Sequence, residues 1–317
     1  MLPSKGLFIS LSLNLLLLAL LFISKCGDPL QSISEPVVQK PRDLLRTTNG
    51  FWSLSRPIMP VDSKGHLAIP PEYTHVKLDV GLSFNGANSA LWLDKLKLPG
   101  RFVIGIEPNA KSFRRLESGY NNIAHNESLC SYKICDSTHP LYKLVREQNR
   151  PYYWALDASH IGKDWFGLQA AVDDGEPRFQ HLNVAEPDLV GTDSLLDAKD
   201  GVGLKMVEKM YVPVIRLSDV FDRIDFDRFK FVEHLKVDAQ GMDGRVLRSA
   251  RQYLKERVVY VTAETGNEQY VGGNEVSVAD YLSSQGFQHE HGETWVNSRF
   301  KKDVSLLNGL DSTATES

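Results

Sequence analysis

From Val76 onward, apolar runs of strand length alternate with stretches of helical periodicity. Strands are expected at 75–82 and 101–109, and helices follow them at 88–96 and 110–118. Parallel strands need long crossover connections, which are usually helices, so this order predicts a mostly parallel sheet covered on both faces. The chain is therefore expected to fold as an α/β protein.

The second half continues this pattern and closes differently. Further strands are expected at 165–172, 178–184, 234–241 and 257–265. A helix at 244–254 would bury one face, formed by Val246, Leu247, Ala250, Tyr253 and Leu254. A last helix at 276–286 precedes two short strands, 287–292 and 293–300, separated by Gly292. These two strands predict a C-terminal antiparallel hairpin at the edge of the sheet.

The N-terminus contains an uncharged segment, Gly6 to Ser24, dominated by leucine and phenylalanine. As a helix it would reach roughly 28 Å, near the lower limit for crossing a bilayer and long for the core of a cleaved signal peptide. We therefore expect a transmembrane signal anchor at 1–25. It would make the chain a single-pass membrane protein of a secretory-pathway compartment, such as the Golgi, with its domain in the lumen. A cleavable signal peptide, which would lead to secretion, and a buried soluble helix are the alternatives.

The flanking regions are less regular. Residues 26–75 are rich in proline, so we expect a stem there, a domain at 76–300 and a polar tail at 301–317. In a lumenal domain Asn126 would be a glycosylation acceptor. Cys130 and Cys135 either pair or stay free, and Cys26 lies at the predicted membrane edge. The net charge of −4 gives no reason to expect a surface that binds nucleic acid, so nucleic acid is not an expected partner.

The stretch "VKLDVGLSFNG" shows where a ligand would bind. In open α/β sheets, ligands lie beyond the carboxyl ends of the strands. The first strand ends on Asp79 and leads into a loop from Gly81 to Gly86, where glycine permits close backbone approach and positive φ. The next strand ends in Glu107, just before Pro108. A carboxylate at that place can accept both hydrogens of a ribose diol.

Two nucleotide-like cofactors suit such a site. A nicotinamide cofactor needs backbone amides around its pyrophosphate, and no G-x-G-x-x-G follows the first strand. An acid at this point would repel a pyrophosphate. S-adenosylmethionine carries a sulfonium, an amino group and no phosphate, so it fits the acidic loop better.

Six segments in order resemble the FkbM-type class I methyltransferase family: "KLDVGLSFNGANSALWL", "GIEPN", "LQAAVDDGEPRF", "GTDSLL", "VIRLSDVF" and "HLKVDAQGMDGRVLRSA". The resemblance covers roughly Val76 to Gly266. It implies a Rossmann-like class I methyltransferase fold and methyl transfer from S-adenosylmethionine, commonly to a hydroxyl oxygen of a sugar, glycan or other small molecule.

The resemblance also implies which residues hold the cofactor. Asp79, Gly81, Asn85 and Gly86 correspond to the first cofactor motif, and Glu107 with Pro108 to the ribose-binding acid and its neighbour. The loop "DVGLSFNG" is longer than the commoner D-V-G-A-N-x-G pattern. Gln240 stands where many relatives carry glutamate, although Asp243 keeps an acid nearby.

The sulfonium already activates the methyl group, so the enzyme mainly aligns an oxygen with it and takes up its proton. Asp238 is the first candidate for base or substrate-positioning acid, and Glu264, at the end of the next strand, is the second. Each would otherwise bind cofactor or cap a helix.

Other polar residues favour structural interpretations. His234 lies four residues before Asp238 and is expected to be a packed histidine. The pair at His289 and His291 is expected on a solvent-facing hairpin, and no metal site is predicted. The segment 221–229 is interpreted as a helix end with solvated ion pairs, and Asp219 as helix-start chemistry.

Two further functions stay open beside the methyltransferase. An inactive methyltransferase-like domain that binds a glycan or a protein is favoured by Gln240 and the altered loop. A nucleotide-binding oxidoreductase is disfavoured by the missing glycine motif. The sequence leaves the acceptor, the adenine-contacting residue and the oligomeric state open.

Overall fold

This computed structural model describes residues 61–83, 85–95, 99–117, 156–185, 191–265, 269–273 and 277–300. All of them belong to one compact unit, Pro41–Ser317. The predicted membrane segment, most of the predicted stem, Asn126, the cysteines and the polar tail lie outside the described residues. Within the described ranges, no helix is long and apolar enough to cross a membrane.

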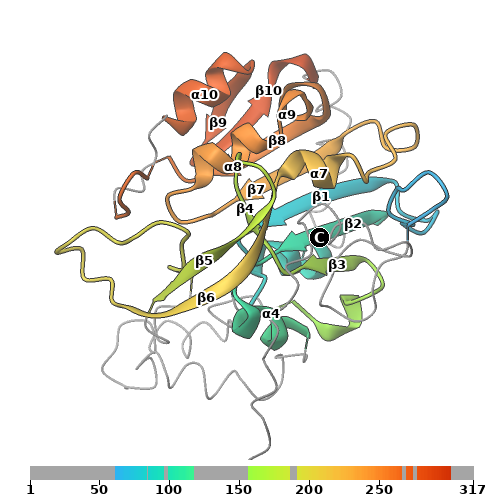
Figure 1. The fold of residues 1–317 in the computed structure, drawn as a ribbon. Helices are drawn as coiled ribbons and strands as arrows, with labels where there is room; N and C mark the ends of the chain where they lie inside the picture. Colours follow the sequence, from blue (N-terminus) through green and yellow to red (C-terminus); the bar gives the residue numbers. More distant parts are fainter. Residues whose placement is uncertain are drawn as a thin grey trace, which may run out of the picture. The chain divides into compact units, whose positions relative to one another are not determined.

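The main sheet has the predicted α/β architecture (Figure 1). Its strands lie side by side in the order β3 (Trp165–Leu168), β2 (Arg101–Ile106), β1 (His75–Val80), β7 (Val232–Val237), β8 (Val258–Ala263), β10 (Thr294–Asn297) and β9 (Phe287–His291). The first five are parallel, and β10 runs antiparallel to both of its neighbours. The predicted edge hairpin is therefore confirmed, with Gly292 at positive φ in its turn.

The helices follow the predicted periodicity with two differences. They are α3 (Ala87–Ala90), the π-helical η1 (Leu91–Lys95), α4 (Ala110–Glu117), α7 (Leu217–Phe221), α8 (Asp243–Ser249), α9 (Gln252–Arg257) and α10 (Val278–Ser284). The helix expected at 88–96 is thus an α-helical turn that continues as a π-helix. The helix expected at 244–254 breaks at Arg251, whose φ is +55°. Its predicted apolar face is nevertheless buried, apart from the partly buried Tyr253.

Side chains along the central strands point alternately to the two faces of the sheet, so a hydrophobic core forms on each face. Val76, Leu78 and Val80 of β1 belong to the larger core, which also contains residues of α7, α8 and α10. The smaller core contains Trp92 of η1, Phe113 of α4 and Trp165 of β3. Helices thus cover both faces, as expected for a parallel sheet.

A second sheet carries β4 (Ala171–Val172), β6 (Met206–Ile215) and β5 (Arg178–Ala185) in that order. The single strand expected at 165–172 is therefore wrong. Its first part, β3, pairs with β2, and its last two residues pair with β6. Buried Asp173 follows this change of sheet and forms ion pairs with Arg178 and with Arg245 of α8.

The end of the predicted stem packs on the domain. Leu67, Ile69 and Tyr73 are buried members of the larger core. Arg228 donates hydrogen bonds to the main-chain carbonyls of Ile69, Pro70 and Tyr73. The interpretation of 221–229 as solvated ion pairs therefore needs correction. Arg228, which belongs to that segment, instead binds the main chain of the segment that leads into β1.

A buried ion triad lies between β1, β2 and β7. Glu233 contacts Lys77 at 3.3 Å and receives two hydrogen bonds from the Arg101 Nε atom, the shorter at 3.0 Å. All three side chains are buried. Burial raises the pKa of Glu233, but the two cations outweigh it and hold the pKa below its ordinary value. The carboxylate is thus the counter-charge for two buried cations.

Glu233→Gln removes that counter-charge and keeps the side-chain shape. Because two buried cations then lose this counter-charge, we expect the free energy of unfolding to fall by about 3 kcal/mol. Urea denaturation followed by circular dichroism measures the change. Glu256→Gln, on the exposed surface of α9, is the matched control and should shift the midpoint little. Equal effects of the two substitutions would contradict the role of the triad.

Candidate functional site

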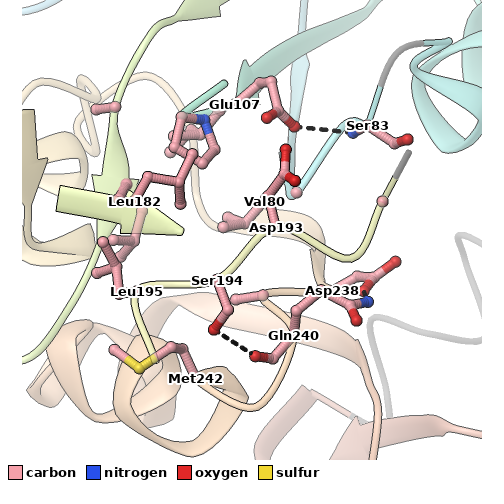
Figure 2. A pocket seen from close by; sticks show the side chains of 18 of the residues that line it. Val80, Ser83, Glu107, Leu182, Asp193, Ser194, Leu195, Asp238, Gln240 and Met242 are labelled. Carbon is pink, nitrogen blue, oxygen red and sulfur yellow. Dashed lines mark hydrogen bonds between the residues drawn. The ribbon is translucent and has the colours of Figure 1, made fainter. Parts of the chain in front are cut away.

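The candidate site lies where the strand order of the main sheet reverses. From β1 the chain builds β2 and β3 on one side, and it later adds β7 and β8 on the other. Such a switch point is where open α/β sheets bind ligands. A pocket opens there (Figure 2), lined by Val80, Gly81, Ser83, Ile106, Glu107, Pro108, Ser112, Ala170, Ala171, Val172, Leu182, Gly191, Asp193, Ser194, Leu195, Asp238, Ala239, Gln240 and Met242.

Gly81 makes the close approach of β1 and β7 possible. Its φ is +78°, and a Cβ atom placed there would lie 1.9 Å from the main-chain oxygen of Asp238. The two strand ends are joined by the Asp238 N–H, which donates to the Val80 carbonyl at 3.0 Å. Only glycine fits this position, as the sequence indicates.

Asp79 lies beneath the pocket and does not line it. It is 1% exposed, and its Oδ2 atom accepts hydrogen bonds from the N–H (2.9 Å) and the hydroxyl (2.7 Å) of Ser89. Its Oδ1 atom accepts no hydrogen bond among the described residues and lies 3.6 Å from the Lys236 ammonium. Burial raises the pKa of Asp79, and Lys236 opposes that shift. Asp79 thus joins α3 to the centre of the sheet.

Asn85 and Gly86 are also not among the residues that line the pocket. The Asn85 carbonyl accepts a hydrogen bond from Leu156, and the Gly86 N–H donates to the Leu82 carbonyl. Gly86 has φ +58° and precedes α3. Both residues therefore shape the loop after β1, and the structure gives neither of them a place on the pocket surface.

Glu107 lines the pocket with an oriented carboxyl group. Its Oε2 atom accepts a hydrogen bond from the Ser83 N–H at 2.8 Å (Figure 2). Its Oε1 atom accepts one from the Asn109 N–H, also at 2.8 Å. Each oxygen keeps a further acceptor site, so the group can still accept two hydroxyl hydrogens. Burial raises the pKa of Glu107 to about 8, and the nearby Asp193 also raises it.

Asp193 is a second acid of the pocket that the sequence reasoning did not single out. Asn109 joins it to Glu107, since the Asn109 side-chain N–H donates to Asp193 Oδ2 at 2.5 Å. The Ala185 N–H donates to Oδ1 at 2.9 Å. Burial raises the pKa of Asp193 as well. Asp193 could have been found from the segment "GTDSLL", because this segment matches the family pattern and contains an acid.

Asp238 lines the pocket and is held on both carboxylate oxygens. Lys236 lies 3.5 Å from Oδ2, and the Gln240 amide donates to Oδ1 at 2.6 Å. The ammonium of Lys236 also reaches Asp79, so it lies between two carboxylates. Burial lowers the pKa of Lys236, but Asp79 and Asp238 outweigh this and raise it. Sequence reasoning missed Lys236 because it stands within an apolar strand.

Glu264 follows β8 and is not part of the pocket lining. Burial, together with the nearby Asp238 and Asp243, raises its pKa to about 7. Asp243 begins α8 and accepts hydrogen bonds from the Ala239 and Gly241 N–H groups. Asp243 therefore holds the loop after β7, whereas Glu264 is an acid that titrates near neutral pH.

The histidines occupy the structural roles expected for them. His234 packs against Trp92 with a ring separation of 5.2 Å, and its Nε2 atom lies 2.9 Å from the Thr262 hydroxyl. Burial lowers the pKa of His234 to about 3. His289 and His291 lie on exposed β9. Across the described ranges, no three metal-ligating side chains lie together.

One wall of the pocket is apolar and includes Ile106, Pro108, Ala170, Leu182 and Leu195. The strand beside β2 is β3, so of the two candidate third strands "WFGLQAAV" is the correct one. The pocket thus combines apolar side chains with the buried Glu107 and the partly buried Asp193. That arrangement suits a ligand with a planar ring and a diol.

The fold and this site define a Rossmann-like α/β protein with a C-terminal antiparallel hairpin. The sequence model of the methyltransferase FkbM domain matches residues 79–289, which is more than half of the chain. The chain therefore belongs to the FkbM methyltransferase family, and the resemblance described above is confirmed. Searches of curated proteins and of solved structures give no match.

Gly81→Ala tests the close approach of the two strands. Gly203→Ala is its matched control, because Gly203 also has positive φ (+76°) but open space around it. Backbone strain alone should lower the free energy of unfolding by about 1 kcal/mol at Gly203, and the clash with Asp238 should raise the loss at Gly81 to about 3 kcal/mol or more. Thermal and urea unfolding measure both. Similar losses would show that Gly81 is not sterically required.

Proposed function

We propose that this protein uses S-adenosylmethionine to methylate a hydroxyl oxygen of a sugar, a glycan or another small molecule. The observation that carries the proposal is Glu107, which is buried in the pocket and keeps a free acceptor site on each oxygen. The cofactor supplies an activated methyl group on a sulfonium, so the protein needs to bind, align and deprotonate. Membership of the FkbM methyltransferase family supports the same reaction class.

The charges around the pocket favour this cofactor over a dinucleotide. Glu107, Asp193 and Asp238 all line the pocket, and a pyrophosphate would repel each of these carboxyl groups in its ionised form. A sulfonium and an ammonium group instead gain from that negative charge. The apolar wall at Ala170, Leu182 and Leu195 suits an adenine ring.

Asp238 and Glu264 then take different roles. Asp238 is fixed by Lys236 and Gln240, so it serves as an oriented negative charge for the cationic part of the cofactor. Glu264 does not line the pocket, but it follows β8, the strand next to β7, and its charge interacts with that of Asp238. Its pKa of about 7 matches a group that takes a proton from an acceptor hydroxyl near neutral pH. We therefore assign Glu264 as the base and Asp238 as the orienting acid.

The site of action follows from the N-terminal sequence. The uncharged run from Gly6 to Ser24 supports a signal anchor, with the domain in the lumen of the secretory pathway. Secretion after signal cleavage is the alternative. Both places contain glycans, which agrees with a sugar or glycan acceptor.

Calorimetric titration of the full chain with S-adenosylmethionine, and separately with NADH, tests the proposed cofactor. We expect saturable binding of S-adenosylmethionine only. Asp238→Asn should weaken it about tenfold, because a charge facing a cation is lost while the shape is kept. Asp227→Asn, which removes an exposed acid away from the pocket, is the control and should bind like the wild type.

Binding of NADH alone would support an oxidoreductase and overturn the proposal. A folded protein that binds neither compound would be a methyltransferase-like domain without cofactor chemistry. Equal affinities of Asp238→Asn and the wild type would remove Asp238 from the cofactor site while leaving the proposed reaction intact.

The raised pKa of Glu107 predicts proton release when the cofactor binds. Near pH 7 its carboxyl is mostly protonated, since its pKa is about 8. A diol that donates two hydrogen bonds and a nearby cation both favour the ionised form. Binding should therefore release up to one proton at about pH 7, and affinity should rise about tenfold per pH unit below the pKa.

Titration in two buffers with different ionisation enthalpies measures this release. An apparent binding enthalpy that is the same in both buffers, together with an affinity independent of pH, would contradict the proposed contact with Glu107. Asp227→Asn should release the same number of protons as the wild type.

A further inference from the structure

Gln240 has an unusual backbone conformation and a side chain with a defined partner on each side. Its φ is +51°, one of three positive values at non-glycine residues in the described ranges. Strain of this kind persists only where neighbouring contacts enforce it. Its main-chain carbonyl accepts a hydrogen bond from the Ser194 hydroxyl at 2.8 Å (Figure 2), which ties the turn to the segment across the pocket.

The side-chain amide of Gln240 can point in only one direction. Asp238 Oδ1 lies 2.6 Å from Gln240 Nε2, and an ionised carboxylate only accepts hydrogen bonds. The amide nitrogen must therefore face Asp238. The amide oxygen then lies 3.2 Å from the Tyr270 hydroxyl, whose proton is shared with the Thr192 carbonyl at 2.7 Å.

We propose that Gln240 is a positioning residue whose amide holds Asp238 oriented into the pocket, and that Tyr270 supports the amide from the other side. This inference rests on the proposed function, because it assigns the oriented carboxylate to the cationic end of S-adenosylmethionine. Tyr270 is fully buried, and its hydroxyl also reaches the segment that carries Asp193 and Ser194. The same tyrosine thereby joins the two sides of the pocket.

The amide explains why glutamine suits this position better than an acid. A glutamate in place of Gln240 would put two carboxylates in contact, and such pairs share one proton. In its protonated form, that glutamate would donate a hydrogen bond to Asp238 as the amide does. In its ionised form, it would repel Asp238 and displace it.

The charged surroundings oppose ionisation of a glutamate at this position. The groups that act on Asp238 or Tyr270 from the elements packed around them are Lys236 of β7, Asp193 of the segment after β5, Asp243 of α8 and Glu264 after β8. Asp79 of β1 acts on Lys236. Lys236 is the one cation of this set and is already shared between Asp79 and Asp238. The pKa of the added carboxyl group should therefore lie well above its ordinary value.

Gln240→Glu in the full chain, studied between about pH 6 and about pH 8.5, tests the inference in two ways. The first readout is the melting temperature without ligand, compared with the wild type at each pH. Because the pKa of the carboxyl pair is raised in the folded state, the variant should approach wild-type stability at low pH and lose it as pH rises. A difference in melting temperature that does not change with pH would contradict the contact between residue 240 and Asp238.

The second readout is the affinity for S-adenosylmethionine relative to the wild type at the same pH. We expect the variant to bind within about threefold at pH 6 and about tenfold more weakly at pH 8.5. Gln240→Ala should bind more weakly at every pH, since it cannot regain the donor. Tyr270→Phe should show a smaller loss that does not vary with pH.

Gln288→Glu, which adds the same charge on exposed β9, is the matched control and should follow the wild type in both readouts. Wild-type affinity in Gln240→Ala would overturn the positioning role. If the wild type binds no S-adenosylmethionine, the proposed function fails, and the melting profile of Gln240→Glu still decides whether the amide holds Asp238.

Discussion

The candidate site depends on the close approach of β1 and β7 at their carboxyl ends. Gly81 has no side chain at the point where a Cβ atom would meet the Asp238 carbonyl, so the two strands can end together. Strand order then places Glu107 on the other side of β1. Glu107 and Asp238, which are far apart in the sequence, thus both reach one pocket, because each follows a strand that ends on the same edge of a parallel sheet.

Buried charge is concentrated along these same strands, and each group has an identifiable partner. Lys236 lies between Asp79 and Asp238, and Glu233 lies between Lys77 and Arg101. Buried ion pairs contribute little net stability, because desolvation offsets their attraction, but they specify geometry. The paired lysine thus fixes where Asp238 stands, while Gln240 fixes how its carboxylate is turned.

The sequence predicted the central strands of the main sheet, the hairpin and the glycine turn after β1, since these depend on local pattern, but it did not predict β6. It predicted Glu107 and Asp238 because each follows an apolar run directly. It missed Asp193, which stands in an irregular segment whose place over the pocket depends on contacts with Asn109 and Ala185. It also missed the change of sheet at 169–170, because both halves of that apolar run have the same periodicity and differ only in their pairing partner.

The acids of the pocket also explain why a cationic ligand suits it. Burial raises the pKa of Glu107 and Asp193, which both line the pocket, so the empty pocket opposes their ionisation. The negative pyrophosphate of a dinucleotide would make ionisation of these carboxyl groups still less favourable. A sulfonium ligand would offset it, and the carboxyl groups would then release protons as they bind. The same burial that opposes ionisation in the empty pocket therefore strengthens attraction to the cation, since few water molecules remain to screen it.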